Sequence, residues 1–224
     1  MISVRSASTG SSGDPTVVAK PVGTAAGDHL VAVHFEDVFG NTAGMTAPGF
    51  AQTGTTYSGT GSCFGKVWQR AVDGSEGSSF SFGNPDTAVV VLLCITGHNP
   101  TTPINVVPVW GDGGANQTSH VAPSATPSVD DALLICGFAA TGSSASYTPP
   151  GGMTERGDAY AGFAFASVAS EVLVGGGGVA TGTRTATCSI SGANAYTSLS
   201  LVVAPAVSTA GRAPKALSQY GGFF

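Results

Sequence analysis

The amino-acid sequence predicts an all-β protein, and three observations support that class. Short apolar runs alternate with clusters of Gly, Pro, Asn and Asp, as they do in β-sandwiches and barrels. No stretch of ordinary helix length repeats its apolar residues every 3.6 positions, so little helix is expected. The features of the first half recur in the same order in the second half. Together these patterns predict a jelly-roll-like β-sandwich made of two repeated four-strand halves.

The predicted strands follow the apolar runs of the chain. They cover residues 16–20, 29–35, 62–70, 78–82 and 88–95 in the first half, and 132–138, 161–171, 183–190 and 196–204 in the second. An open sheet of about four strands has an apolar face that needs a partner. We therefore expect the two halves to cover each other within one sandwich.

The internal repeat is carried by two pairs of segments. Residues 27–35 match 130–138, because each segment has an Asp-bearing turn that leads into an apolar strand ending in Phe. Residues 46–50 (Thr-Ala-Pro-Gly-Phe) match 148–153 (Thr-Pro-Pro-Gly-Gly-Met). Because the order of these features is preserved, the halves are predicted to share one architecture.

The predicted domain organisation has one sandwich and two flanking segments. It comprises an N-terminal arm (1–14), the sandwich (15–206) with halves at about 15–97 and 128–206, a loop-rich joining segment (98–127) and a C-terminal tail (207–224). The tail has basic residues, no acidic residue, and aromatic residues near its end. We expect it to dock on a neighbouring subunit, with these assembly contacts: Arg212, Lys215, Tyr220, Phe223 and Phe224.

Charge argues against nucleic-acid and membrane partners. Only 9 % of the residues are charged, against about 25 % in an ordinary domain, and the net charge is -5. Binding to phosphates needs clustered Lys and Arg, whereas the three lysines and five arginines of this chain are scattered. The longest apolar run, residues 88–95, is far shorter than the roughly 20 residues that cross a bilayer.

The first residues predict the localisation. They contain no basic segment followed by an apolar one, so no secretory signal is predicted. The surface composition, rich in Gly, Ser and Thr and poor in Lys, is typical of proteins outside cells or inside large assemblies. A virion protein made in the host cytoplasm and released by lysis fits both observations.

The cysteines are expected to be buried thiols. Cys63, Cys94, Cys136 and Cys188 are far apart and form no Cys-x-x-Cys pair, so a zinc site has little support. Two of them lie in apolar strands, where free Cys behaves as a small hydrophobic residue. A reducing compartment of synthesis favours free thiols over disulfides.

Three short segments carry a resemblance to a known family. They are residues 27–32 (Gly-Asp-His-Leu-Val-Ala), 47–50 (Ala-Pro-Gly-Phe) and 148–156 (Thr-Pro-Pro-Gly-Gly-Met-Thr-Glu-Arg). Together they resemble a module of virion proteins from phages that infect actinobacteria, often described as minor tail proteins. The family pattern has a Pro-Ala-Gly-Trp turn, and this chain departs from it with Phe50 and Met153 in the place of Trp. The resemblance covers about residues 15–205 and implies a β-sandwich in a phage tail.

The candidate chemical residues are better explained as structural. His34 lies near Glu36 and Asp37, but strand alternation places it on a sheet face, where we expect a surface or interface histidine. Asp28 and Asp131 precede equivalent strands and are expected to cap turns. The Gly run 175–178 lacks the Gly-Lys-Ser/Thr ending of a phosphate loop, so a flexible hairpin tip is predicted. No catalytic, metal-binding or cofactor-binding residue is predicted.

The aromatic residues suggest one alternative kind of site. Trp68 alternates within a predicted strand and is expected in the core. Trp110 lies in a Gly-rich segment, predicted to be an exposed loop, and with Tyr57 it is the candidate contact for a glycan ring.

The sequence thus favours a non-enzymatic phage virion structural protein, a minor tail or tail-tip component. Its partners would be copies of itself and other virion proteins. Two alternatives stay open at this stage: a capsid decoration protein that stabilises the head, and a carbohydrate- or receptor-binding module for host cell-wall glycan. A glycan hydrolase would need two carboxylates about 5–10 Å apart across a cleft, for which the sequence gives no support.

Overall fold

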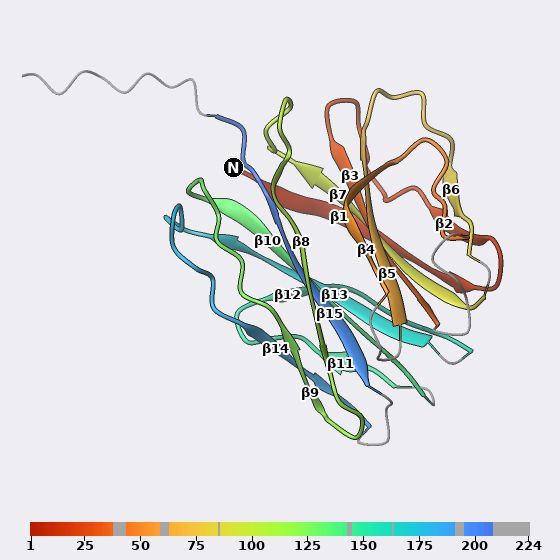
Figure 1. Cartoon of the computed structure of the whole chain (residues 1–224). Coiled ribbons are helices and arrows are strands. Elements are labelled where there is room, and N and C mark those ends of the chain that lie inside the picture. Colours follow the sequence, from red (N-terminus) through yellow and green to blue (C-terminus); the bar gives the residue numbers. More distant parts are fainter. Residues whose placement is uncertain are drawn as a thin grey trace, which may run out of the picture.

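The structure, a computed structural model, confirms the all-β class. It describes residues 1–37, 44–58, 63–84, 86–142, 145–162, 164–190 and 195–207, and within these ranges it contains strands and no helix. The strands form two large antiparallel sheets and two small ones (Figure 1).

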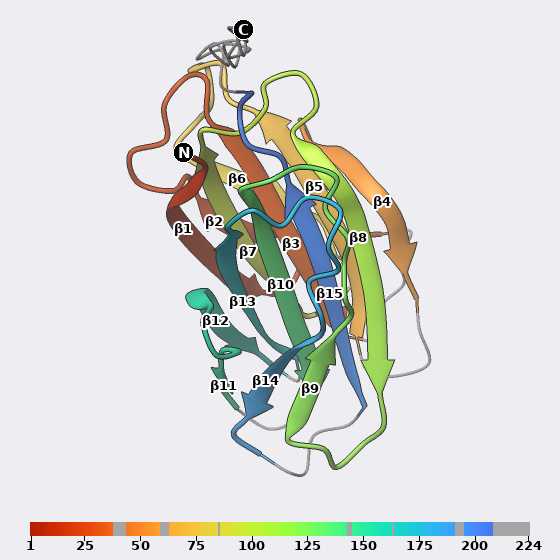
Figure 2. The same cartoon turned by 90° about the vertical axis from the view of Figure 1, so that its left-hand side faces the viewer.

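Each large sheet has five strands. The first has the order β1 (Ser3–Ser12), β7 (Ala88–Thr96), β3 (His29–Asp37), β5 (Cys63–Ala71) and β4 (Ala51–Tyr57). The second has the order β12 (Thr154–Ala161), β13 (Ala164–Leu173), β10 (Ala132–Thr141), β15 (Tyr196–Val203) and β8 (Ile104–Gly113). Each sheet takes all its strands from one half of the chain, and the sheets pack face to face (Figure 2). The sandwich is confirmed, and its jelly-roll detail stays a prediction.

Two small sheets belong to the outer faces of the sandwich. β2 (Thr16–Ala19) pairs with β6 (Ser79–Phe82), and β14 (Arg184–Cys188) lies between β11 (Tyr147–Thr148) and β9 (Ser119–Ala122). An apolar cluster joins β2 and β6 to the outer face of the first sheet. A second cluster joins the other small sheet to the outer face of the second large sheet. The molecule therefore has four layers, and the central strands of each large sheet are buried on both faces.

The two halves share one topology. If β1, β3, β4, β5 and β7 are matched with β8, β10, β12, β13 and β15, the strand order is the same in both sheets. In each half the first strand pairs with the last. The contacts between sheets follow the same correspondence, because β1 packs beside β12 at one edge and β4 beside β8 at the other. The sandwich therefore resembles a symmetric pair of units within one chain.

The matched turns have the same geometry. The Phe50 amide donates to the Ala47 carbonyl at 3.0 Å, and the Met153 amide donates to the Pro150 carbonyl at 3.1 Å. The residue before each donor is a glycine with a φ of 80° or 84°, which other residues rarely adopt and which a type II turn requires. Phe50 and Met153, which stand where the resembled family has Trp, both pack against the outer apolar clusters.

The predicted alternation on β3 is confirmed. Val31, Val33 and Phe35 face the central core between the sheets, whereas Leu30 and Ala32 face the cluster under β2 and β6. All nine residues of β3 are buried. A strand with two apolar faces reads as a continuous apolar run, which explains why the central strands were recognisable.

The match between residues 27–35 and 130–138 is wrong by one position. Phe35 faces the central core, whereas Phe138 faces the outer cluster of the second sheet. Gly137 takes the position on the central face, where a Cβ would lie 3.2 Å from the Phe35 ring. A shift of one residue in the match moves every side chain to the other face of a strand. The residues that face the central core in both strands therefore identify the correct match.

The predicted arm and joining segment are corrected by the structure. Residues 3–12 of the arm form β1 and pair with β7, and the segment 98–127 contains β8 and β9. Each half accordingly supplies five strands to its large sheet and further strands to a small one, where four strands were expected. β1 is rich in Ser, and β8 contains Pro108 and two glycines, so neither has the composition of a central strand.

A glycine allows the two sheets to approach each other near the β4–β8 edge. A Cβ on Gly65 of β5 would lie 2.5 Å from the ring of Trp110 on β8. The indole has little room to move, because its Nε1 donates to the Thr55 carbonyl and its ring packs edge-on against Phe35.

We predict that Gly65→Ala lowers the free energy of unfolding by about 1–3 kcal/mol, because overpacking forces neighbouring side chains out of position. Urea unfolding followed by tryptophan fluorescence measures the change. Gly151→Ala is the control, since a Cβ there would meet nothing within 4 Å and should change the midpoint little. Equal midpoints for the two variants would contradict the close contact.

Candidate functional site

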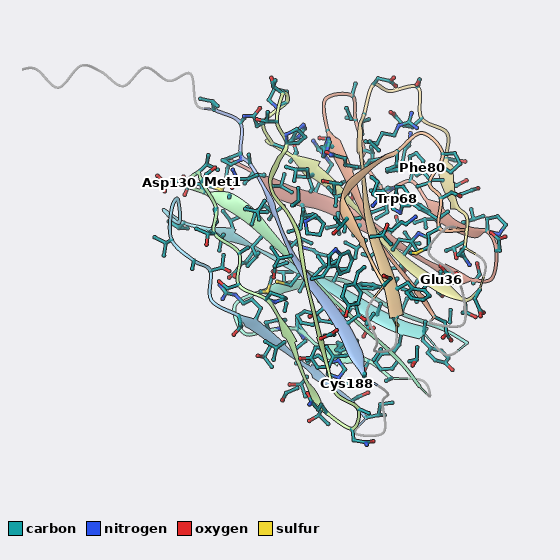
Figure 3. The ribbon with its side chains drawn as sticks, viewed as in Figure 1. Met1, Glu36, Trp68, Phe80, Asp130 and Cys188 are labelled. Atoms are coloured by element: carbon teal, nitrogen blue, oxygen red, sulfur yellow. The ribbon has the colours of Figure 1, made fainter. Side chains whose placement is uncertain are left out.

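One end of the sandwich carries an apolar groove. It has a volume of about 660 Å³ and is called the end groove below. Its walls come from the two residues before β1, the segment after β7, the turn before β10, the end of β13 and the segment after β15. Met1 and Asp130 lie at this end of the molecule (Figure 3).

Backbone hydrogen bonds fix one wall of the end groove. The Ala206 amide donates to the Gly97 carbonyl at 2.8 Å, and the Asn99 amide donates to the Ala204 carbonyl at 2.8 Å. These bonds hold the segment that follows β15 against the segment that follows β7. The last described residues of the chain therefore form part of the groove, and residues 208–224 follow directly from its rim.

The end groove combines an apolar surface with a negative rim. Val174 is 88 % exposed and Val207 is 75 % exposed, which is unusual for large apolar side chains that share one hollow. Asp130 and Asp131 also line it, whereas Lys, Arg and His are absent from its described lining. The groove is therefore suited to an apolar segment with positive charge.

The two rim aspartates also brace the Gly-rich segment. Asp130 accepts a hydrogen bond from the Gly177 amide at 2.9 Å, and Asp131 accepts one from the Gly175 amide at 3.2 Å. Neither carboxylate belongs to the three ion pairs found among the described residues. The glycines lie between β13 and β14, which belong to different sheets, so the predicted hairpin tip is corrected to a loop between sheets.

A second group of polar residues is buried on the outer side of the first sheet. His34 and Glu36 are fully buried on β3, and Lys66 lies opposite His34 on β5. Lys66 Nζ donates to the Met45 carbonyl at 3.0 Å and lies 5.3 Å from the Trp68 ring centroid. His34 was expected at a surface or an interface and is instead buried within the chain, because this face of β3 lies under β2 and β6, where His34 packs edge-on against Phe82.

Burial controls the protonation of this group. It lowers the pKa of His34 to about 3, with help from the charge of Lys66. It raises the pKa of Glu36 to about 7, to which the charges of Asp86 and Asp14 contribute. A histidine that stays neutral and a carboxyl that takes up a proton near neutrality fit a closed interior, where charge is costly. Since both residues are fully buried, their protonation bears on stability and gives no support to catalysis.

A third group ties the start of β3 to β1. Arg5 Nε forms an ion pair with Asp28 at 3.0 Å, and the Ala25 amide donates to the same carboxylate. Burial raises the pKa of Asp28, but the bonds from Arg5 and Ala25 outweigh it and leave the pKa below its usual value. The His29 and His98 rings lie tilted to each other with centroids 5.0 Å apart, and burial, followed by the charge of His98, lowers the pKa of His29 to about 4.

The two candidate glycan residues lie together and contact each other. Tyr57 at the end of β4 stacks on Trp110 of β8 with ring centroids 5.4 Å apart. The Tyr57 hydroxyl donates to Asp112, and the Trp110 Nε1 donates to the Thr55 carbonyl. Trp110 therefore lies half-buried in an edge strand, which corrects the expected exposed loop. The pair connects the two sheets at the β4–β8 edge, and both of its polar groups already have protein partners.

The other sequence candidates have the following positions. Trp68 is buried as expected, and all four cysteines are buried and free. Asp28 and Asp131 both accept bonds from backbone amides, which fits the expected capping role. No cluster of three metal-binding side chains is found within the described ranges. The tail contacts Arg212, Lys215, Tyr220, Phe223 and Phe224 lie outside the described residues.

Sequence reasoning missed the end groove as a site. Its lining comes from five segments that are far apart in the chain, so no local motif marks it. The one available signal was the pair Asp130-Asp131, together with a valine at position 174 that directly precedes the Gly run.

We predict that Glu36→Gln raises the free energy of unfolding by about 3 kcal/mol at pH 8 and by little near pH 4.5, at 1.36 kcal/mol per unit of pKa difference. The pKa of this carboxyl is 4.5 in the unfolded chain and about 7 in the folded one. Between these two pH values the folded wild type binds more protons than the unfolded chain, so the wild type loses stability as the pH rises. Urea unfolding at several pH values tests this, with the exposed Glu155→Gln as control. A pH-independent difference would contradict the buried proton.

Comparison with other proteins leaves the family open. A search of protein-family models, of curated proteins and of solved structures finds no match to this chain. Among the described residues, no helix is long and apolar enough to cross a membrane.

Proposed function

We propose that this chain is a non-enzymatic structural protein of a phage virion, held in place by contacts between subunits. The observation that carries the proposal is the end groove, an apolar, acid-rimmed hollow from whose edge the C-terminal tail continues. The tail itself is apolar and basic. A surface that fits a segment of the same chain is what repeated copies need in order to join each other.

The distribution of reactive groups supports assembly over catalysis. His34 and Glu36 are fully buried, and Asp28 is tied to Arg5 and to a backbone amide. The four thiols are buried, and burial raises the pKa of Cys94 to about 11 and of Cys136 to about 12, which keeps them protonated and unreactive. These groups are placed to hold the sheets together.

The aromatic pair gives less support to glycan binding. A sugar ring stacks on an aromatic face that is open to water. Tyr57 and Trp110 each give one face to the other, and both are half-buried. We therefore propose subunit assembly as the function and treat binding to host cell-wall glycan as the weaker alternative.

The proposal places the chain in the tail or tail tip of the virion, following the resemblance of its turn and strand segments to minor tail proteins. Synthesis would take place in the host cytoplasm. A capsid decoration protein would use the same rigid scaffold on the head. Imaging separates the two positions, because the tail and the head are resolved as different parts of a particle.

We predict that antibodies against the recombinant chain label gradient-purified phage particles, with the label on the tail. Immunogold electron microscopy gives the position, and quantitative mass spectrometry of the same particles gives the copy number. Label on the head would replace the tail position with capsid decoration. If the chain occurs only in the soluble fraction of the lysate, the virion proposal is wrong.

We predict that a chain truncated after Val207 stays folded but no longer enters the particle. The three apolar clusters lie within the truncated chain, so the urea midpoint should move little. Addition of each protein to particles that lack it, followed by sedimentation, measures incorporation. If the truncated chain enters as well as the full one, the tail is not the anchor.

A further inference from the structure

The end groove has the properties of a docking site for a peptide. It collects apolar side chains from both large sheets, among them Ile2 and Val172 at its base and the exposed Val174 at its rim. Ile2 belongs to the central core, and Val172 packs against that core. An occupant would therefore extend the central core at the open end of the sandwich.

Charge narrows the identity of the occupant. The rim carries Asp130 and Asp131, which take part in no ion pair among the described residues. Residues 208–224 contain Arg212 and Lys215 and no acidic residue, and they include three aromatic side chains. The segment thus offers apolar side chains to match the apolar base of the groove and positive charge to match its acidic rim.

We propose that the end groove binds the C-terminal tail, residues 208–224, of a neighbouring copy. Tyr220, Phe223 and Phe224 would fill the apolar base, and Arg212 and Lys215 would lie near the two rim aspartates. The fit between groove and tail follows from the properties of the two segments alone. The choice of a neighbouring copy as the source of the tail, in place of the same chain, rests on the proposed role in assembly. Repeated use of this head-to-tail contact would connect copies into a ring or a row.

Peptide binding tests the fit without any particle. The chain truncated after Val207 keeps the groove walls and lacks the tail. A fluorescent peptide of residues 208–224 should bind it in an anisotropy titration, and affinity should fall with added salt because ionic contacts contribute. A peptide with Ser in place of the three aromatic residues should show no measurable binding, and one with Gln in place of the two basic residues should bind about fivefold more weakly.

A matched pair of variants locates the binding to the groove. Val174→Lys should weaken binding by at least about tenfold, because it removes apolar surface and places a positive charge at the rim. Val22→Lys is the control, since Val22 is almost equally exposed and lies outside the groove. Equal loss in the two variants, or no binding of the wild-type peptide, overturns the proposal while leaving the particle-labelling result untouched.

Light scattering of the full-length chain shows whether the tail that occupies a groove comes from a neighbouring copy or from the same chain. A neighbour's tail in the groove predicts a mean mass that rises with protein concentration, and a return to monomer after truncation or Val174→Lys. A full-length chain that stays monomeric at every concentration and excludes the peptide would show that the tail occupies its own groove. That outcome overturns the neighbouring copy as the occupant, and the particle experiments then decide the proposed function separately.

Discussion

The fold depends on the burial of both faces of six central strands. β3, β5 and β7 in one sheet and β10, β13 and β15 in the other have inner faces in the central core and outer faces under a small sheet. Each buried apolar side chain contributes about 1.5–3 kcal/mol. Because neither large sheet could leave its inner face in water, each half stabilises the other, and the few surface charges have little part in it.

How much of this could be predicted from the sequence depends on where a strand lies in its sheet. All six central strands were predicted, and β3, β7 and β10 were the clearest, since their two buried faces give nearly continuous apolar runs. The four edge strands β1, β4, β8 and β12 were missed. They carry Ser, Thr, Gly and Pro and are only partly buried, a composition that is shared with loops.

The candidate sites were predictable to a smaller extent. The burial of Trp68 and of the thiols followed from strand alternation and composition. The burial of His34 did not, because it depends on a small sheet whose two strands are far apart in the sequence and cover one end of β3. The end groove also needed the three-dimensional structure, since its acidic rim and its apolar base become one surface only when the open ends of both sheets meet.

The pairing of first and last strands in each half has a consequence for synthesis on the ribosome. The first sheet can close once β7 has emerged, because β1 pairs with β7. The second sheet needs β15, which ends at residue 203, before its edge strand β8 finds its neighbour. Between these two moments the nascent chain carries a complete sheet whose inner face, with Val31, Val33 and Phe35, has no cover. Translation speed through the second half, and any chaperone that binds this face, would therefore decide how much chain escapes aggregation.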